Sequence, residues 1–280
     1  MYPRKFEYVA ASSVDEAVSA LADAEFAKVM AGGMSLIPMM KLRLLSPELV
    51  VDIGRVPGLD QITDEGDHVS IGALVRHAQT AASTLVPKSL SDAAAWTGDP
   101  QVRNRGTTCG AVAHSDIAAD QTAPVLALGA TMVVQGPAGT RQIPAADFYV
   151  DTLTSALEPD EVLVEIRIPK TSGVSAYDKL GRRGGHTDYA VAGAAAWVEK
   201  SNGSVSDCRV ALTGVGTKAS LAEGVAEALI GTDGSEAAIR QAAERAVEGV
   251  TVLEDLYGSE EYKTHLAKVY TRRALTQALA

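Results

Sequence analysis

Cysteine is nearly absent from this chain of 280 residues: only Cys109 and Cys208 occur, far apart in the sequence. Two thiols exclude a disulfide framework and fit a reducing compartment, so we expect a cytoplasmic protein. Because an iron–sulfur cluster normally takes four cysteine thiolates, this chain cannot hold one by itself. The five histidines are scattered without the spacing of a zinc site.

Long apolar runs and blocks of basic residues are also missing. Without a sufficiently long apolar run we expect no membrane span, and the N-terminal residues lack the apolar core of a signal peptide. The formal net charge is −10 and Lys and Arg form no cluster, so we expect no nucleic-acid partner. Such an acidic protein must bind an anion through local backbone N–H groups rather than through its overall field.

What is present is ordinary globular composition, with 46% hydrophobic and 21% charged residues. Ser13 and Glu16 form a capping-box pattern before a helical apolar face. A strand around 28–30, a glycine turn, a helix from about Ser35 to Pro47 and a strand at 48–53 should complete a β-α-β unit.

The pattern then changes along the chain. Between 57 and 170 we expect strands at 68–73 and 161–169, a hairpin at 131–144, and helices at 74–83, 89–96 and 118–130, the last amphipathic. The stretch 102–116 fits neither pattern and should be ordered loop and short strand. From about 172 the patterns are strands and then helices, which predicts an α+β fold with helices on one face of an antiparallel sheet. These strands are expected at 175–180, 189–200 and 205–215, and the helices at 218–230, 235–249 and 259–279.

Two glycine-containing loops are the candidate ligand sites. Gly32 and Gly33 stand between a strand and a helix, where they serve either a tight turn or the close approach of a ligand to the backbone. A second loop, residues 105–120, carries small residues, hydroxyls and two carboxylates. Two such loops on separate subdomains could grip a diphosphate. For Asp116 and Asp120, capping of the following helix is the alternative to a ligand role.

A third glycine pattern matches a dinucleotide-binding motif but lacks its sequence context. The stretch from Gly214 to Ala219 fits G-x-G-x-x-A and lies between a strand and a helix. A dinucleotide-binding fingerprint continues into a parallel strand, whereas this sequence continues from helix to helix. A plain turn is therefore expected here.

Four blocks in fixed order, residues 30–53, 103–130, 156–169 and 177–198, carry a resemblance over nearly the whole chain. The sequence resembles the FAD-binding medium subunit of molybdenum hydroxylases, the xanthine dehydrogenase and carbon monoxide dehydrogenase group. The resemblance implies a two-lobed FAD-binding domain of the vanillyl-alcohol-oxidase (PCMH) type over 1–171, with lobes of about 1–56 and 57–171. A C-terminal α+β domain with an antiparallel sheet and helices would follow over 172–280.

The resemblance also implies a set of FAD-binding residues and no catalytic residue. The first loop should wrap the pyrophosphate, the 162–163 backbone should face the adenine side, and the 179 and 188–189 positions should lie near the isoalloxazine ring. Cys109 and Ala111 depart from the residues usual in the family, and Ala111 removes one side-chain contact to the cofactor. The implied set is Ala31, Gly32, Gly33, Met34, Ser35, Thr107, Gly110, Ala111, His114, Asp116, Asp120, Val162, Leu163, Lys179 and Tyr189. Without the resemblance, Lys179 reads as a solvated strand residue and Tyr189 as a core residue.

By the same resemblance the chain is an electron-transfer subunit. A large molybdenum-cofactor subunit would hydroxylate the substrate, and a small [2Fe–2S] subunit would pass electrons to FAD and on to an external acceptor. A heterotrimer or a dimer of heterotrimers is implied. Two other interpretations keep the fold: a self-sufficient FAD oxidoreductase, and a scaffold that has lost FAD.

Overall fold

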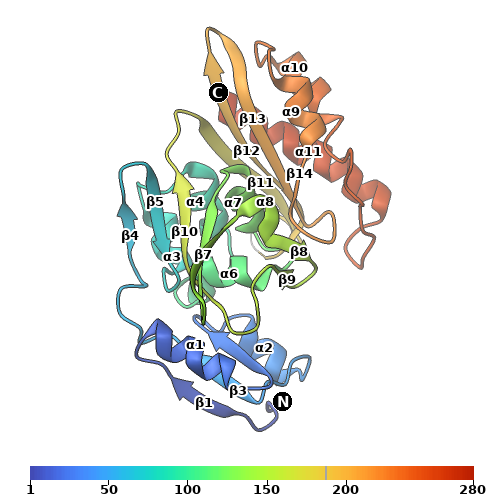
Figure 1. The fold of residues 1–280 in the computed structure, drawn as a ribbon. Helices are drawn as coiled ribbons and strands as arrows, with labels where there is room; N and C mark the ends of the chain where they lie inside the picture. Colours follow the sequence, from blue (N-terminus) through green and yellow to red (C-terminus); the bar gives the residue numbers. More distant parts are fainter. Residues whose placement is uncertain (187) are drawn as a thin grey trace.

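The computed structural model describes residues 1–186 and 188–280. Its N-terminal part is a β-α-β lobe, as predicted, in which three parallel strands pair in the order β1-β3-β2 (Figure 1). The strands are β1 (Glu7–Ala10), β2 (Ala27–Met30) and β3 (Leu49–Asp52), and the helices are α1 (Val14–Ala22) and α2 (Leu36–Lys41). The Ser13 side chain caps α1 by accepting the Glu16 N–H.

The helix predicted to continue to Pro47 ends at Lys41 instead. Arg43 takes a positive φ of 60°, which no helix can continue through. Only Met40 of α2 is buried, and Leu42 and Leu44 are exposed. The apolar pattern of this segment therefore does not mark a face that packs on the core.

The middle of the chain forms a five-stranded antiparallel sheet in the order β4-β5-β10-β6-β7. These strands are β4 (Ile62–Asp64), β5 (His68–Gly72), β6 (Thr131–Gly136), β7 (Gly139–Pro144) and β10 (Val162–Pro169). Short helices and a two-stranded ribbon connect them: α3 (His77–Ala82), α4 (Lys88–Ala95), α5 (Pro100–Arg103), α6 (Thr108–His114), α7 (Thr122–Ala127), α8 (Ala145–Phe148), β8 (Tyr149–Asp151) and β9 (Thr154–Ser155).

Two predictions for this region are wrong. The stretch 102–116 was predicted as loop and strand but contains α6 and the end of α5, each started by a side chain that caps it: Asp99 accepts the Val102 N–H and Thr107 accepts the Gly110 N–H. Caps stabilise helices too short and too glycine-rich to show a period. The helix predicted as amphipathic over 118–130 is the six-residue α7, and all its residues are buried.

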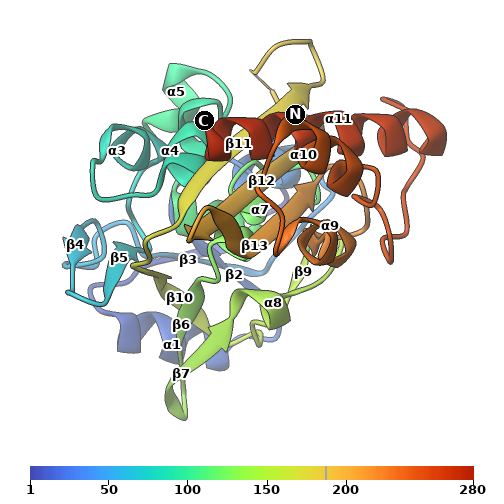
Figure 2. The ribbon, with the colours of Figure 1, turned by 90° about the horizontal axis from the view of Figure 1, so that it is seen from above.

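The C-terminal sheet is antiparallel in the order β11-β12-β13-β14, and its first three strands are the predicted ones. They are β11 (Val174–Gly181), β12 (Ala190–Ser201), β13 (Ser204–Thr213) and β14 (Ser220–Leu221), followed by α9 (Glu223–Leu229), α10 (Glu236–Ala243) and α11 (Glu260–Leu279). Figure 2 shows α11 running across this sheet. The segment after Gly214 is a plain turn, as expected, but it leads into the short antiparallel β14, and the helix predicted over 218–230 begins only at Glu223.

Helices cover both faces of this sheet: those of its own domain lie on one face, as predicted, and the second cover comes from an earlier part of the chain. The C-terminal helices cover one face, and α4 and α7 of the middle region contact the strands from the other. Alternate residues of β12 accordingly enter different cores: Ala194 and Ala196 pack with the C-terminal helices, and Ala195 and Trp197 with the middle region. Burial on both faces explains the unbroken apolar run of β12.

Candidate functional site

The first glycine loop, residues 31–35, joins β2 to α2 and exposes a run of hydrogen-bond donors. Gly33 has a φ of +75°, a conformation that residues with a side chain rarely adopt. Its carbonyl accepts the Ile37 N–H at 3.0 Å. Within the described part of the chain, no acceptor receives a hydrogen bond from the backbone N–H groups of residues 32–36. Consecutive free N–H donors of this kind are suited to binding an anion.

Gly32 has a different reason to lack a side chain. A Cβ at this position would overlap the carbonyl oxygen of Arg105 and lie 2.9 Å from the Cα of Gly106. The two loops predicted as separate ligand sites therefore touch, backbone against backbone. This contact is a third reason for the glycine pair, beside the turn and the approach of a ligand.

The second loop is fixed to the start of α3. The Gly106 carbonyl accepts the His77 N–H, and the Thr108 N–H donates to the Val75 carbonyl, both at 3.0 Å. The His77 ring packs on Gly106, where a Cβ would lie 2.8 Å from its Cδ2 atom. Burial, with the charges of Arg103 and Arg76, lowers the pKa of His77 to about 4. Sequence reasoning missed His77, because only the folded chain places it against this loop.

Thr107 and Gly110, both predicted to bind cofactor, contact one another in the cap of α6. The Thr107 Oγ1 accepts the Gly110 N–H at 3.1 Å. Ala111 and His114 follow on the same helix and are half-buried, and burial lowers the pKa of His114. Thr107 is therefore a helix cap in the first place, and its hydroxyl proton remains available to a ligand.

The two carboxylates of the second loop differ sharply. Asp116 is half-buried and its Oδ1 accepts the Ala118 N–H at 2.9 Å, which closes a local turn. It does not cap the following helix, the alternative weighed from the sequence, because Gln121 is the N-cap of α7. Asp120 is buried, and its two oxygens accept hydrogen bonds from the Tyr177 hydroxyl and the Lys179 Nζ, each at 2.7 Å. Burial raises the pKa of Asp120 to about 6, against the opposing effects of Lys179 and Tyr177.

Lys179 is not solvated, in contrast to the interpretation that its sequence position alone suggests. Its side chain is fully buried, and its Nζ also donates to the Asp188 carbonyl at 2.6 Å. Asp188 has a positive φ of 82°, so Lys179 holds a strained residue directly before Tyr189.

Tyr189 is 40% exposed, so it is not a core residue. Partial burial and the charge of Asp116 raise its pKa, and the Ser35 hydroxyl lowers it. These neighbours place Tyr189 beside both predicted loops. Met34, next to Ser35, is partly exposed as well.

Val162 and Leu163 begin β10 and pair with Gln135 and Val134 of β6. Both side chains are buried in the core, and a β-bulge follows between Leu163 and Glu165. Burial of both side chains leaves only the backbone of these two residues for contact with a ligand.

Comparison with known proteins identifies the family. The family model described as FAD binding domain in molybdopterin dehydrogenase matches residues 4–171, and the CO dehydrogenase flavoprotein C-terminal domain matches residues 175–278. This chain belongs to the FAD-binding medium chains of the molybdenum hydroxylases.

Relatives of known structure agree with this assignment. The carbon monoxide dehydrogenase medium chain of Hydrogenophaga pseudoflava is 42% identical, covering 100% of this chain and 99% of the relative. The structure of carbon monoxide dehydrogenase from that organism superposes with a TM-score of 0.94 at 43% identity, covering 99% of this chain and 98% of that chain. The structure of quinoline 2-oxidoreductase from Pseudomonas putida 86 superposes with a TM-score of 0.93 at 34% identity, covering 100% of this chain and 98% of that chain. The medium-chain fold is thus shared along the whole length.

The cofactor of these medium chains is FAD, and the first loop fits its diphosphate. An acidic chain needs local donors to hold a diphosphate, and residues 32–36 provide consecutive free N–H groups. The loop contact through Gly32 brings the second predicted loop to the same place.

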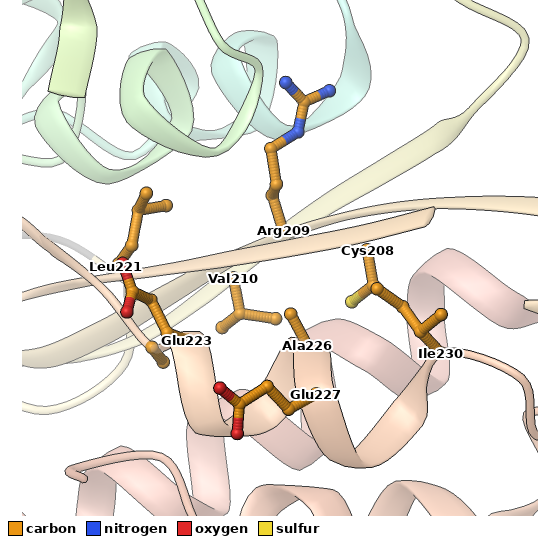
Figure 3. Close-up of a pocket in the computed structure, with 9 residues that line it drawn as sticks. Cys208, Arg209, Val210, Leu221, Glu223, Ala226, Glu227 and Ile230 are labelled. Atoms are coloured by element: carbon orange, nitrogen blue, oxygen red, sulfur yellow. The ribbon is translucent and has the colours of Figure 1, made fainter. Parts of the chain in front are cut away.

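Two open pockets of this medium chain lie elsewhere. One of about 270 Å³ lies between α9 and strands β13 and β14, where Cys208, Val210 and Ile230 line it (Figure 3). Another of about 500 Å³ lies on the outer face of the five-stranded sheet, beside His68 and Arg167. None of the predicted FAD-binding residues lines either pocket. In the described part of the chain, no helix has both the length and the apolar character needed to cross a membrane.

Proposed function

We propose that this medium chain is the electron-transfer subunit of a molybdenum hydroxylase complex. Electrons from [2Fe–2S] clusters on a small subunit pass through FAD to an external acceptor, and a large subunit with the molybdenum cofactor hydroxylates the substrate. The complex is a heterotrimer or a dimer of heterotrimers. The free N–H groups of residues 32–36, next to the Gly32 loop contact, carry the proposal.

The chain's own residues bind and orient the cofactor. Residues 31–35 hold the diphosphate, the capped α6 and Asp116 complete the second wall, and the 162–163 backbone meets the adenine side. FAD, when bound, supplies the electron-transfer chemistry. The Asp120–Lys179 pair holds Asp188 and thereby the next residue, Tyr189, in a fixed position. Tyr189 then lines one edge of the isoalloxazine ring. No residue of this chain acts as an acid or a base in the hydroxylation.

The two cysteines support the assignment of the iron–sulfur clusters to another subunit and of the protein to the cytoplasm. Cys109 and Cys208 are both buried and unpaired, and burial raises the pKa of the Cys208 thiol to about 12. Two buried thiols on different elements do not ligate a cluster. A cytoplasmic location accords with free thiols. We also propose that the FAD-binding and C-terminal domains meet near residue 171.

The test is reconstitution from separate subunits. The chain purified alone should carry FAD and show flavin absorbance, yet oxidise no hydroxylase substrate. Adding the small and large subunits encoded with it should produce substrate-dependent flavin reduction. Turnover by the lone chain would instead support a self-sufficient oxidoreductase, and a colourless chain that takes up no FAD in the assembled complex would support a scaffold.

A further inference from the structure

The first and second loops meet at the peptide between Arg105 and Gly106. A Cβ on Gly32 of the first loop would overlap the Arg105 carbonyl oxygen, so the two backbones are in contact there. Figure 1 shows the N-terminal lobe, which carries the first loop, below the middle region, which carries the second. The spacing of the two loops therefore depends on what holds this peptide in place.

Two consecutive residues at the start of α3 bind the carbonyls on both sides of the peptide. The Arg76 guanidinium donates from its Nη1 to the Arg105 carbonyl, and the His77 N–H donates to the Gly106 carbonyl at 3.0 Å. Arg76 is itself fixed, because its own N–H donates to the Gln79 Oε1 at 2.8 Å. One carbonyl of the second loop thus meets both a charged side chain of the middle region and the backbone of the N-terminal lobe.

The Arg76 side chain is half-buried and lies near charges from both lobes. Burial and the charge of Arg105 lower its pKa, and the charges of Asp52, at the end of β3, and Asp60, before β4, raise it. A guanidinium stays protonated under either influence. In the described part of the chain its hydrogen-bonding groups have one partner, the Arg105 carbonyl. Arg76 therefore directs its charge at a backbone carbonyl, where a charged donor forms a stronger bond than a neutral one.

We propose that Arg76 is a positioning residue for FAD: by fixing the Arg105 carbonyl at its contact with Gly32, it sets the spacing of the two loops. The proposal rests on the function proposed above, in which residues 31–35 hold the diphosphate. Loops whose spacing is set before the cofactor arrives bind it more tightly, because less ordering is left for the binding step. Arg76 acts through the second loop and not by contact with the diphosphate.

The test is flavin titration of apoproteins altered at Arg76. Arg76→Met removes the donor and should weaken FAD binding about tenfold, because the loops must then be ordered during binding. Arg76→Lys retains a charged donor for the carbonyl and should stay within about threefold of the wild type.

The matched control is Lys218→Met. Lys218 lies before β14, is half-buried like Arg76, and donates from its Nζ to a backbone carbonyl, that of Tyr149, at 3.0 Å. This variant should bind FAD like the wild type. Each titration is done below the melting temperature of its variant, so that affinity is measured separately from stability.

Two further measurements show how Arg76 acts. Gly32→Ala breaks the same backbone contact from the N-terminal lobe. The double variant with Arg76→Met should therefore bind FAD about as weakly as Gly32→Ala alone, because both changes act on one contact. The salt dependence of FAD affinity should be the same in Arg76→Met and the wild type, because no ion pair with the diphosphate has been removed.

Four results would overturn the positioning role. They are wild-type FAD affinity of Arg76→Met, an equal loss in Arg76→Lys or Lys218→Met, additive effects of Gly32→Ala and Arg76→Met, and a weaker salt dependence in Arg76→Met. The last would make the guanidinium a direct ligand of the diphosphate. Failure of the proposed function is distinguished by the wild type, which would then take up no FAD or show no substrate-dependent flavin reduction in the complex, whatever Arg76→Met does.

Discussion

Asp120 and Lys179 form a buried ion pair whose loss should lower the stability of the whole fold. The Lys179 side chain is fully buried and its ammonium depends on the Asp120 carboxylate and the Asp188 carbonyl. Asp120→Ala leaves that ammonium without its counter-charge, which should lower the free energy of unfolding by about 3–5 kcal/mol. Denaturant unfolding of the apoprotein measures the change.

An exposed ion pair in the same chain is the control. Lys170 and Asp64 are about as close, at 2.5 Å, but their side chains are 41% and 43% exposed. Asp64→Ala should therefore cost roughly 0–1 kcal/mol. Equal losses in the two variants would mean that burial of the Asp120 pair has no energetic consequence.

His77 should make the stability of the apoprotein depend on pH. Its pKa is about 4 in the fold and 6.5 as the ordinary value, so protonation is disfavoured in the native state. The stabilisation is complete above pH 6.5 and declines as the pH falls toward 4. At pH 5 the loss from this group is about 2 kcal/mol relative to pH 7.

His77→Asn is the variant that separates this titration from all others. The Asn side-chain oxygen can take the place of Nδ1, which lies 3.2 Å from the Gln121 amide nitrogen. Unfolding free energies of both proteins at pH 7 and pH 5 should differ in their pH dependence by about 2 kcal/mol. Parallel pH profiles would show that His77 is accessible to protons in the native state.

The sequence could predict which residues carry the chemistry better than it could predict their partners. The glycines, hydroxyls and carboxylates of the two loops were visible as types in a pattern. The bonds of Asp120 were not, because Tyr177 and Lys179 lie 57 and 59 residues away and reach it only through tertiary packing. The same applies to His77 and Gly106.

At the scale of elements, the first loop should be sensitive to strain. Gly33 and Gly58 both have positive φ, +75° and +82°, but Gly58 has no atom within 4 Å of its Cβ position. Alanine at either place costs about 1–2 kcal/mol of backbone strain. Only Gly33→Ala should also weaken FAD binding, by about tenfold, because the strain moves the free N–H groups of residues 32–36.

Flavin titration of the two apoproteins tests this. Gly58→Ala carries the same kind of strain without touching the loop, so it should lower stability and leave FAD affinity unchanged. Equal FAD affinity in both variants would mean that the conformation at Gly33 serves only the turn.

Elements with a clear hydrophobic period were predicted well, and those without one were not. Helix α1, the strands of the N-terminal lobe and strands β11 to β13 follow their patterns. In the same lobe the apolar pattern after Lys41 is not helical. Helix α6 begins from a Thr107 cap and contains glycine, and α7 is buried all round, so neither shows an amphipathic period. The cover of the inner face of the C-terminal sheet was missed because α4 and α7 come from a distant part of the chain.

At the scale of the whole molecule, the C-terminal sheet ties the chain into one cooperative unit. Its inner face, with Tyr177, Ala195, Trp197 and Ala211, belongs to the core of the middle region. Backbone bonds cross as well, from the Ala190 N–H to the Ala118 carbonyl at 3.1 Å. A cut near residue 171 would expose this apolar face on both fragments.

We therefore expect calorimetry of the full apoprotein to show a single unfolding transition. A fragment of residues 172–280 produced alone should aggregate or bind a hydrophobic dye, because one face of its sheet has lost its cover. Co-expression with residues 1–171 should restore a soluble pair that melts together, since the missing face is then supplied. Two separate transitions in the full chain, or a C-terminal fragment that melts cooperatively by itself, would show that each half is stable without the shared core.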